Sequence, residues 1–147
     1  MIRIEGEKLL EYFRQTKEFI FLDSVVIESE EKNAQGVKKL SPDEWFFALH
    51  FPDDPVMPGV FQMEAVMQTG GLILNTMEGK KEQKLYFYSC EDAKIYKSAR
   101  PGCVLKTSAE LKSYRRGIAK FTGNARIDDE IACELKFTII VPEEIIS

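Results

Sequence analysis

The sequence contains a single histidine, His50, and only three cysteines. These cysteines, Cys90, Cys103 and Cys133, are odd in number and show no C-x-x-C spacing. A structural zinc site needs four suitably spaced Cys or His ligands, and a disulfide framework needs paired cysteines. The sequence therefore predicts reduced, buried thiols and no metal site.

The chain also lacks an excess of basic residues, since its formal net charge is −4. This argues against a general nucleic-acid-binding surface. The N-terminus has no basic region followed by an apolar run, which is how a signal peptide begins. The longest apolar region, residues 60–77, is interrupted by Gln62, Glu64, Gln68 and Asn75, which a membrane-spanning helix would not carry. We expect a soluble, cytoplasmic protein without a nucleic-acid or membrane partner.

No repeat, low-complexity tract or linker divides the sequence, so we expect one domain over residues 1–147. The N-terminal third predicts short elements, each from its local pattern. They are a helix within residues 6–15, a strand over 19–27, a charged turn over 28–33 and a second strand ending at Leu40. Ser41-Pro42-Asp43-Glu44 has the S-x-x-E capping-box pattern, which predicts a brief helix that begins there.

The C-terminal half predicts an antiparallel meander with one solvated face, because apolar or small residues alternate there with polar ones. The expected strands are residues 105–112, 119–127 and 131–139, separated by turns at 115–117 and 128–130. Residues 85–97 predict one more long strand, bent near Glu91-Asp92.

Residues 58–77 predict one long helix that is apolar nearly all round and should therefore be buried. One buried helix with about six antiparallel strands predicts an α+β protein in which the sheet wraps around a central helix.

Glu64 is the exceptional residue of this helix, because its neighbours one and two turns away are mostly apolar. A buried carboxyl without a partner has a raised pKa and stays protonated near neutral pH, as a general acid requires. Two structural alternatives remain open. Glu64 could be hydrogen-bonded to Gln68 one turn on, or to a partner chain.

His50 taken alone would more often be structural than catalytic, but its context favours chemistry. A proline-stiffened loop leads from His50 to Pro58-Gly59 at the start of the long helix. The backbone N–H of Gly59 would lie at the positive end of the helix dipole, where developing negative charge on an oxygen is stabilised. A base, an oxyanion donor and a buried acid thus occur within one short segment, which is a reaction-site hypothesis.

The same segment reads His50-Phe-Pro-Asp-Asp-Pro-Val-Met-Pro-Gly-Val-Phe-Gln-Met-Glu64-Ala-Val-Met-Gln68. It resembles the signature of the (3R)-hydroxyacyl-[acyl carrier protein] dehydratases, H-F-x-x-x-P-x-M-P-G-x-x-x-x-[ED]-A-x-x-Q. Weaker similarity covers most of the chain, including residues 19–23, 97–102 and the Arg-Arg-Gly turn at 115–117. The sequence departs from the family at Leu49 and Asp53, where glycines are common.

The resemblance implies a hot-dog fold and a homodimer with shared active sites, with a trimer of dimers left open. It implies that His50 removes the α-proton of a 3-hydroxyacyl thioester and that Glu64 protonates or orients the departing hydroxyl of the substrate. The Gly59 N–H would hold the thioester oxygen, and Phe51, Val60, Met63 and Gln68 would contact the substrate. No cofactor or metal is implied.

The implied partner is an acyl carrier protein, which is acidic. Basic residues are candidates for meeting it, although a solvated surface is an equally good reading of each one. They are Lys80, Lys81, Lys84, Lys94, Lys97, Arg100, Arg115 and Arg116. Asp53 and Asp54 are read first as charges that complement the helix N-terminus, and otherwise as a sign of altered substrate choice or lost activity.

Two alternative functions stay open. A hot-dog acyl thioesterase would direct water at the thioester instead of removing an α-proton. A non-catalytic acyl-binding subunit would bind thioesters without turnover, and Leu49 and Asp53 motivate this reading.

Overall fold

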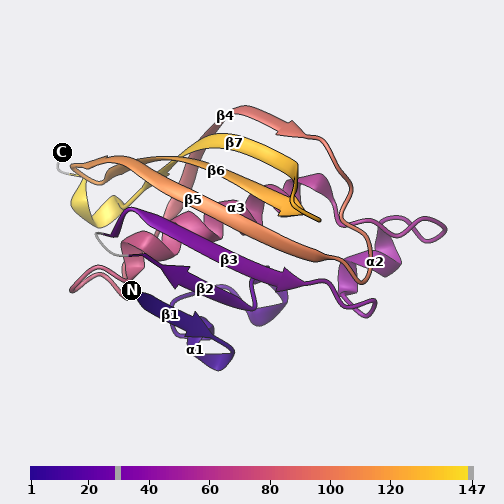
Figure 1. The fold of residues 1–147 in the computed structure, drawn as a ribbon. Helices are drawn as coiled ribbons and strands as arrows, with labels where there is room; N and C mark the ends of the chain where they lie inside the picture. Colours follow the sequence, from indigo (N-terminus) through magenta and orange to yellow (C-terminus); the bar gives the residue numbers. More distant parts are fainter. Residues whose placement is uncertain (29–30, 146–147) are drawn as a thin grey trace.

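The computed structural model describes residues 1–28 and 31–145, and its strands form one antiparallel sheet of seven in the order β1-β2-β3-β5-β6-β7-β4. In Figure 1 the sheet lies in front of the long helix α3, and β1 and β4 form its two edges. The strands are β1 (Ile2–Glu5), β2 (Ser24–Ile27), β3 (Asn33–Lys39), β4 (Tyr86–Ile95), β5 (Val104–Arg115), β6 (Ile118–Ile127) and β7 (Glu130–Ile140).

The C-terminal meander is confirmed, since β5 pairs with β6 and β6 with β7. Most alternate side chains of these strands are buried, as Leu105, Thr107 and Ala109 on β5 illustrate. The expected turn at residues 115–117 is also present, and Arg116 and Gly117 adopt positive φ angles there. The alternation in the sequence thus identified the face of the sheet that meets the helix.

The long helix is confirmed as α3 (Gly59–Asn75), with Pro58 as its N-cap residue rather than its first helical residue. Every residue from Ala65 to Asn75 is buried. The helix is therefore surrounded by protein over most of its length, as its lack of a polar face predicted.

The N-terminal segment differs from the expectation. The helix expected within residues 6–15 covers only α1 (Glu7–Leu10), and β1 before it was not predicted. The strand expected over 19–27 begins only at β2, because residues 17–19 form a short 3-10 helix, η1 (Lys17–Phe19). Residues 20–22 are buried all the same, since this segment packs beside α3 instead of pairing in the sheet. The turn expected over 28–33 includes residues 29–30, which lie outside the described part.

The helix expected at Ser41 begins four residues later, as α2 (Trp45–Leu49). The capping-box residues still interact, because the Ser41 N–H donates to Glu44 Oε2 at 3.2 Å. This bond closes a turn before the helix rather than capping its first turn. Another 3-10 helix, η3 (Pro142–Glu144), follows β7.

The long strand expected over 85–97 is β4, and the bend expected near Glu91-Asp92 is confirmed. The pairing of β4 with β7 shifts register between Glu91 and Lys94, and Asp92 has a φ of 51°. Such a bulge twists a strand locally. Among the described strands β4 pairs only with β7, so its other edge is not paired with any of them.

The three cysteines are free thiols, but only Cys133 is buried. Cys103 is half-buried and Cys90, on the edge strand, is exposed, so the expectation of buried thiols is wrong for Cys90. Over residues 1–28 and 31–145, no helix is long and apolar enough to cross a membrane. The same residues include no group of three or more His, Cys, Asp or Glu side chains placed to hold a metal ion.

Candidate active site

His50 follows α2 directly and is held by its own loop. The Val56 N–H donates to the His50 carbonyl oxygen at 2.9 Å, and the imidazole ring lies 3.9 Å from the ring of Phe51, centroid to centroid. His50 Nδ1 lies 3.2 Å from the carbonyl oxygen of Val56. Because a carbonyl only accepts, this bond requires a proton on Nδ1. In the neutral ring Nε2 then has a free lone pair, as a base needs.

Glu64 lies in the second turn of α3 and is half-buried. Burial raises the pKa of its carboxyl from 4.5 to about 7, although the hydrogen bond from Gln68 opposes this shift. Desolvation dominates because it penalises the charged form more than one hydrogen bond to that form restores. A substantial fraction of Glu64 is therefore protonated at neutral pH.

Gln68 fixes the position of the Glu64 carboxyl. Its Oε1 accepts the Phe21 N–H at 2.9 Å, while its Nε2 donates to the Phe19 carbonyl oxygen at 2.9 Å and to Glu64 Oε2 at 2.8 Å. The Phe21 N–H identifies the amide oxygen, so the amide nitrogen must face Glu64. The structural alternative for Glu64, a bond to Gln68, is thus present, and it holds Oε2 as an acceptor. This favours Oε1 as the oxygen that carries the proton.

Gly59 is the first residue of α3, so its N–H is one of those without an acceptor inside the helix. A Cβ at this position would lie 2.4 Å from Ile95 Cδ1, so a larger residue here would require the end of the Ile95 side chain on β4 to move. Of the other expected contact residues, Met63 is half-buried against the core. Val60 and Phe51 are 63% and 49% exposed, a surface open to a second molecule.

An open groove begins at Glu64 and runs along α3, with a volume of about 130 Å³. Its lining includes Gln68 but not His50 or Phe51, so the structure brings Glu64 and Gln68 together and leaves His50 outside the groove. The outer walls of the groove were not predicted from the sequence; they are Phe13, Arg14, Gln15, Gln83, Leu85 and Phe87. The available signal was the stripe Glu64, Gln68, Gly71 and Asn75 on one side of the helix.

Residues 14–136 match the profile of the FabA-like domain. The chain belongs to the FabA-like family. Its relatives include a 3-hydroxyacyl-[acyl-carrier-protein] dehydratase FabZ from Mannheimia succiniciproducens, 36% identical over 134 residues that make up 90% of this chain and 89% of the relative. A protein of the same name from Anoxybacillus flavithermus is 32% identical over 126 residues, 86% of this chain and 89% of the relative.

Solved structures confirm the hot-dog fold of this FabA-like chain. A chain of the dehydratase heterocomplex ApeI:P from Xenorhabdus doucetiae superposes with a TM-score of 0.75 at 14% identity, covering 91% of this chain and 90% of that one. A hypothetical thioesterase from Streptococcus pneumoniae, also 14% identical, has a TM-score of 0.60 and covers 80% and 84%. At this identity the likeness shows the fold alone.

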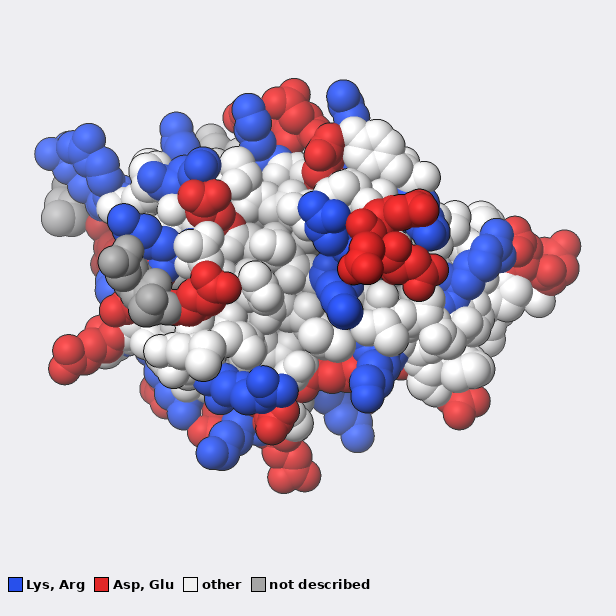
Figure 2. Space-filling model, in the orientation of Figure 1, with Lys and Arg blue, Asp and Glu red and all other residues white. Residues whose placement is uncertain are grey.

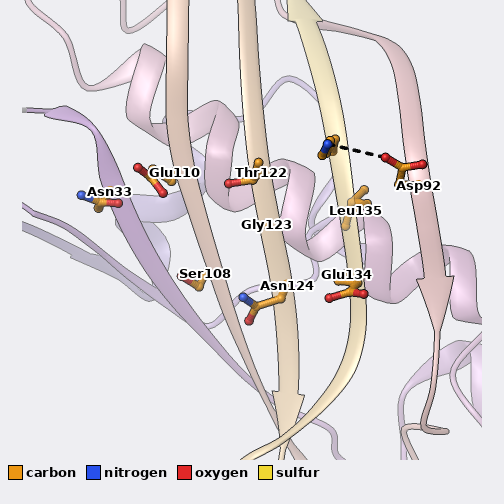
Figure 3. Close-up of a pocket in the computed structure, with 10 residues that line it drawn as sticks. Asn33, Asp92, Ser108, Glu110, Thr122, Gly123, Asn124, Glu134 and Leu135 are labelled. Carbon is orange, nitrogen blue, oxygen red and sulfur yellow. Dashed lines mark ion pairs between the residues drawn. The ribbon is translucent and has the colours of Figure 1, made fainter.

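A larger hollow, about 420 Å³, lies on the outer face of the FabA-like sheet, away from α3 (Figure 3). Figure 2 shows that this face has an uncharged centre between groups of charged side chains. Acidic residues line the hollow, and one of them, Asp92, forms an ion pair with Lys136 at 3.6 Å. None of the expected site residues lines it, and Gly59, Glu64 and Gln68 belong to α3 on the other side of the sheet.

Several of the basic residues considered for carrier binding already form ion pairs within the chain. Arg100 pairs with Asp54 at 2.7 Å, and Lys81 with Glu11 at 2.8 Å. The Asp54 carboxylate thus pairs with Arg100, so its charge does not act on the positive N-terminus of α3 alone. Such exposed pairs contribute about 0–1 kcal/mol to stability. A carboxylate of an acidic partner could therefore replace the carboxylate in either pair at little cost in free energy.

Raising the pH from 5 to 8 is expected to destabilise the wild-type protein relative to Glu64→Gln. The folded carboxyl has a pKa of about 7 against an ordinary value of 4.5. Between these values the folded state binds more protons than the unfolded state, so stability falls as pH rises through this window. Because Glu64 is partly exposed, the effect is smaller than the full pKa shift implies. Between pH 5 and pH 8 we expect the free energy of unfolding of the wild type to fall by on the order of 1–2 kcal/mol more than that of Glu64→Gln. Urea unfolding at both pH values measures it, and parallel changes in the two proteins would contradict the raised pKa.

Proposed function

We propose that this chain dehydrates 3-hydroxyacyl-[acyl carrier protein] thioesters to trans-2-enoyl thioesters and water. Relatives of this name cover most of the chain at 32–36% identity, which supports a hydro-lyase. The observation that carries the proposal is the Glu64 carboxyl. This carboxyl has a pKa of about 7, and Gln68 holds it beside the groove. A general acid is most effective when its pKa lies near the working pH.

In the proposed reaction, His50 Nε2 removes a proton from C2 of the substrate. The electron pair of that C–H bond forms the double bond between C2 and C3 as the C3–O bond breaks. The departing hydroxyl takes the proton of Glu64 Oε1 and leaves as water. The Gly59 N–H stabilises the negative charge that develops on the thioester oxygen, an effect worth about 10²–10³ in rate for a well-placed donor.

The edge strand β4 supports a homodimer in which a second copy completes the site. Its side chains are exposed on both faces although many are large and apolar, including Tyr88 at 71% and Tyr86 at 53% exposure. An open edge with exposed apolar side chains is a template for strand pairing, and such patches usually mark an interface. Pairing of two β4 strands would cover these side chains. The proposed dimer then lets His50 of one copy meet Glu64 of the other.

We expect enoyl product when the protein is given a four-carbon 3-hydroxyacyl carrier-protein thioester. Removal of the α-proton yields a conjugated enoyl thioester, whose absorbance can be followed directly, while a thiol reagent detects any hydrolysis in a parallel sample. Release of free thiol without enoyl product would replace the proposal with a thioesterase. Binding of the thioester without either product would replace it with a non-catalytic acyl-binding protein.

A further inference from the structure

One peptide unit, between Val56 and Met57, orients the imidazole of His50. Its carbonyl oxygen lies 3.2 Å from His50 Nδ1, which is the contact that requires a proton on Nδ1. On the opposite side of the same unit, the Met57 N–H donates to the Ala99 carbonyl oxygen at 2.8 Å. Because a peptide unit is planar, it turns as a whole, and the bond to Ala99 also fixes the carbonyl that faces His50. The orientation of His50 thus depends on a residue far away in the sequence.

The segment 97–100, which contains Ala99, is anchored to the sheet on both sides. Before it, the Tyr96 N–H donates to a carbonyl oxygen of β7 at 2.7 Å. After it, the carbonyl oxygen of Cys103 accepts the N–H of the residue that follows β3, at 2.9 Å. Ala99 itself is fully buried. The segment is therefore a fixed support for whatever it contacts.

Gln62 ties the same segment to α3. Its side chain is 1% exposed, and its Nε2 donates to the Lys97 carbonyl oxygen at 2.9 Å. Burying an amide is costly unless it is hydrogen-bonded, so this bond is what makes a glutamine tolerable here. Lys97 thus offers a carbonyl to the helix that begins at Gly59, and Ala99 offers one to the loop of His50. One segment holds both parts of the proposed site.

Arg100 holds the other end of the His50 loop. It donates to Asp54 Oδ1 at 2.7 Å. Asp54 in turn closes a turn with Phe51, since the N–H of each residue donates to the carbonyl oxygen of the other, at 3.0 and 3.1 Å. Phe51 directly follows His50. The ion pair is exposed, so it contributes less to holding the loop than the two buried hydrogen bonds do.

Building on the proposed function, we propose that residues 97–100 support the proposed base, and that Gln62 and Asp54 act through this segment as positioning residues. They fix the Val56–Met57 peptide, which keeps the proton of the neutral imidazole on Nδ1 and leaves the Nε2 lone pair for the substrate. The hydrogen bond made by one ring nitrogen determines which tautomer is present. Neither Gln62 nor Asp54 lines the groove beside Glu64, so their loss should change the rate rather than substrate binding.

The first test uses the fact that His50 is the only histidine of the chain. In protein labelled with ¹⁵N at histidine, only the two ring nitrogens of His50 give imidazole signals, and their positions tell which one carries the proton. At about pH 8, where an ordinary imidazole is neutral, the wild type should carry the proton on Nδ1. Gln62→Leu should show a mixture of the two tautomers. A proton on Nε2 in the wild type, or an unchanged spectrum in folded Gln62→Leu, would overturn the inference.

The second test measures kcat and KM with the four-carbon substrate. Gln62→Leu should lower kcat by about 10- to 100-fold with little change in KM, because a small displacement of a catalytic group has an effect of this size. Asp54→Asn should lower kcat by about two- to fivefold, as expected of an exposed pair, and Asp54→Glu should keep the wild-type value. A change in KM alone would mean that these residues bind the substrate, which contradicts a positioning role.

Thr69→Val is the matched control for Gln62→Leu. Thr69 is also buried on α3, and its hydroxyl forms a buried hydrogen bond with Thr107 Oγ1 at 2.6 Å instead of bonding to the segment 97–100. Its loss should lower the free energy of unfolding without changing the tautomer of His50 or kcat. If Thr69→Val changes the tautomer as much as Gln62→Leu does, the effect is one of general stability and the inference fails.

Glu110→Gln is the corresponding control for Asp54→Asn. It also removes the carboxylate of an exposed ion pair, here with Lys112 at 3.3 Å, and it should leave kcat unchanged. If Gln62→Leu fails to fold, Gln62→Met takes its place with a more adaptable side chain. The Asp54 variants alter only an exposed side chain and test the inference independently.

The tautomer measurement separates this inference from the proposed function. Absence of enoyl product in the wild type overturns the dehydratase, while the spectra still show whether Gln62 and the segment 97–100 orient His50. Normal turnover in the wild type, with the same spectra and rates in every variant, overturns only the positioning role.

Discussion

Replacing His50 by alanine, or Glu64 by glutamine, is expected to lower the rate of enoyl formation by about 10²- to 10⁴-fold. Alanine removes the proposed base, and glutamine keeps the shape of Glu64 but cannot release the proton that the leaving hydroxyl needs. Neither change should unfold the protein. His50 is only half-buried, and a glutamine at residue 64 can still accept the hydrogen bond from Gln68. The rates are measured with the four-carbon substrate at saturation.

A matched control separates the loss of chemistry from a general effect of charge. Glu78→Gln makes the same carboxyl-to-amide change at an exposed position just after α3, and its rate should stay close to that of the wild type. Circular dichroism and thermal unfolding confirm that the variants are folded. Wild-type rates in purified His50→Ala or Glu64→Gln would rule out the assigned pair.

A dimer that joins one His50→Ala chain to one Glu64→Gln chain is expected to recover activity that both parent variants lack. If each site takes its histidine from one copy and its glutamate from the other, both lesions fall in the same site of the mixed dimer. The second site keeps an intact His50 and an intact Glu64. The purified mixed dimer should therefore show about half of the wild-type rate, since one of its two symmetry-related sites works.

The experiment uses two affinity tags, one on each variant, and a two-step purification after co-expression. The homodimers of each variant, carried through the same purification, give the background. An inactive mixed dimer would place both groups within one chain, because each chain would then carry a lesion in its own site. Recovery in a mixture that elutes as a monomer would also contradict the shared site.

The parts of the fold that local patterns determine could be predicted from the sequence. The burial of α3 follows from its lack of a polar face, and the meander β5–β7 follows from alternation within each strand. The N-terminal errors have the opposite origin. Residues 19–22 have the composition of a strand, but their backbone groups bond to the side chain of Gln68, far away in the sequence. No local pattern reveals such a partner.

The candidate site divides in the same way. The spacing of Glu64 and Gln68 predicted their contact, because residues four apart on a helix are neighbours. The partner of Asp54 and the walls of the groove could not be predicted, since Arg100 and Leu85 reach the site only through the tertiary arrangement. The order of the strands likewise depends on β4 crossing to pair with β7.

The open edge of β4 has a consequence for how the protein behaves on dilution. A strand with one neighbour and exposed aromatic side chains gains its second partner only from another chain. In the proposed dimer, the same association event buries this edge and completes the reaction centre. Folding stability and specific activity then follow one mass-action curve, rising together with protein concentration. Below the dissociation constant of the dimer, total activity rises more steeply than protein concentration, and above it the two rise in proportion. The cell could therefore set the activity of such a protein through its abundance.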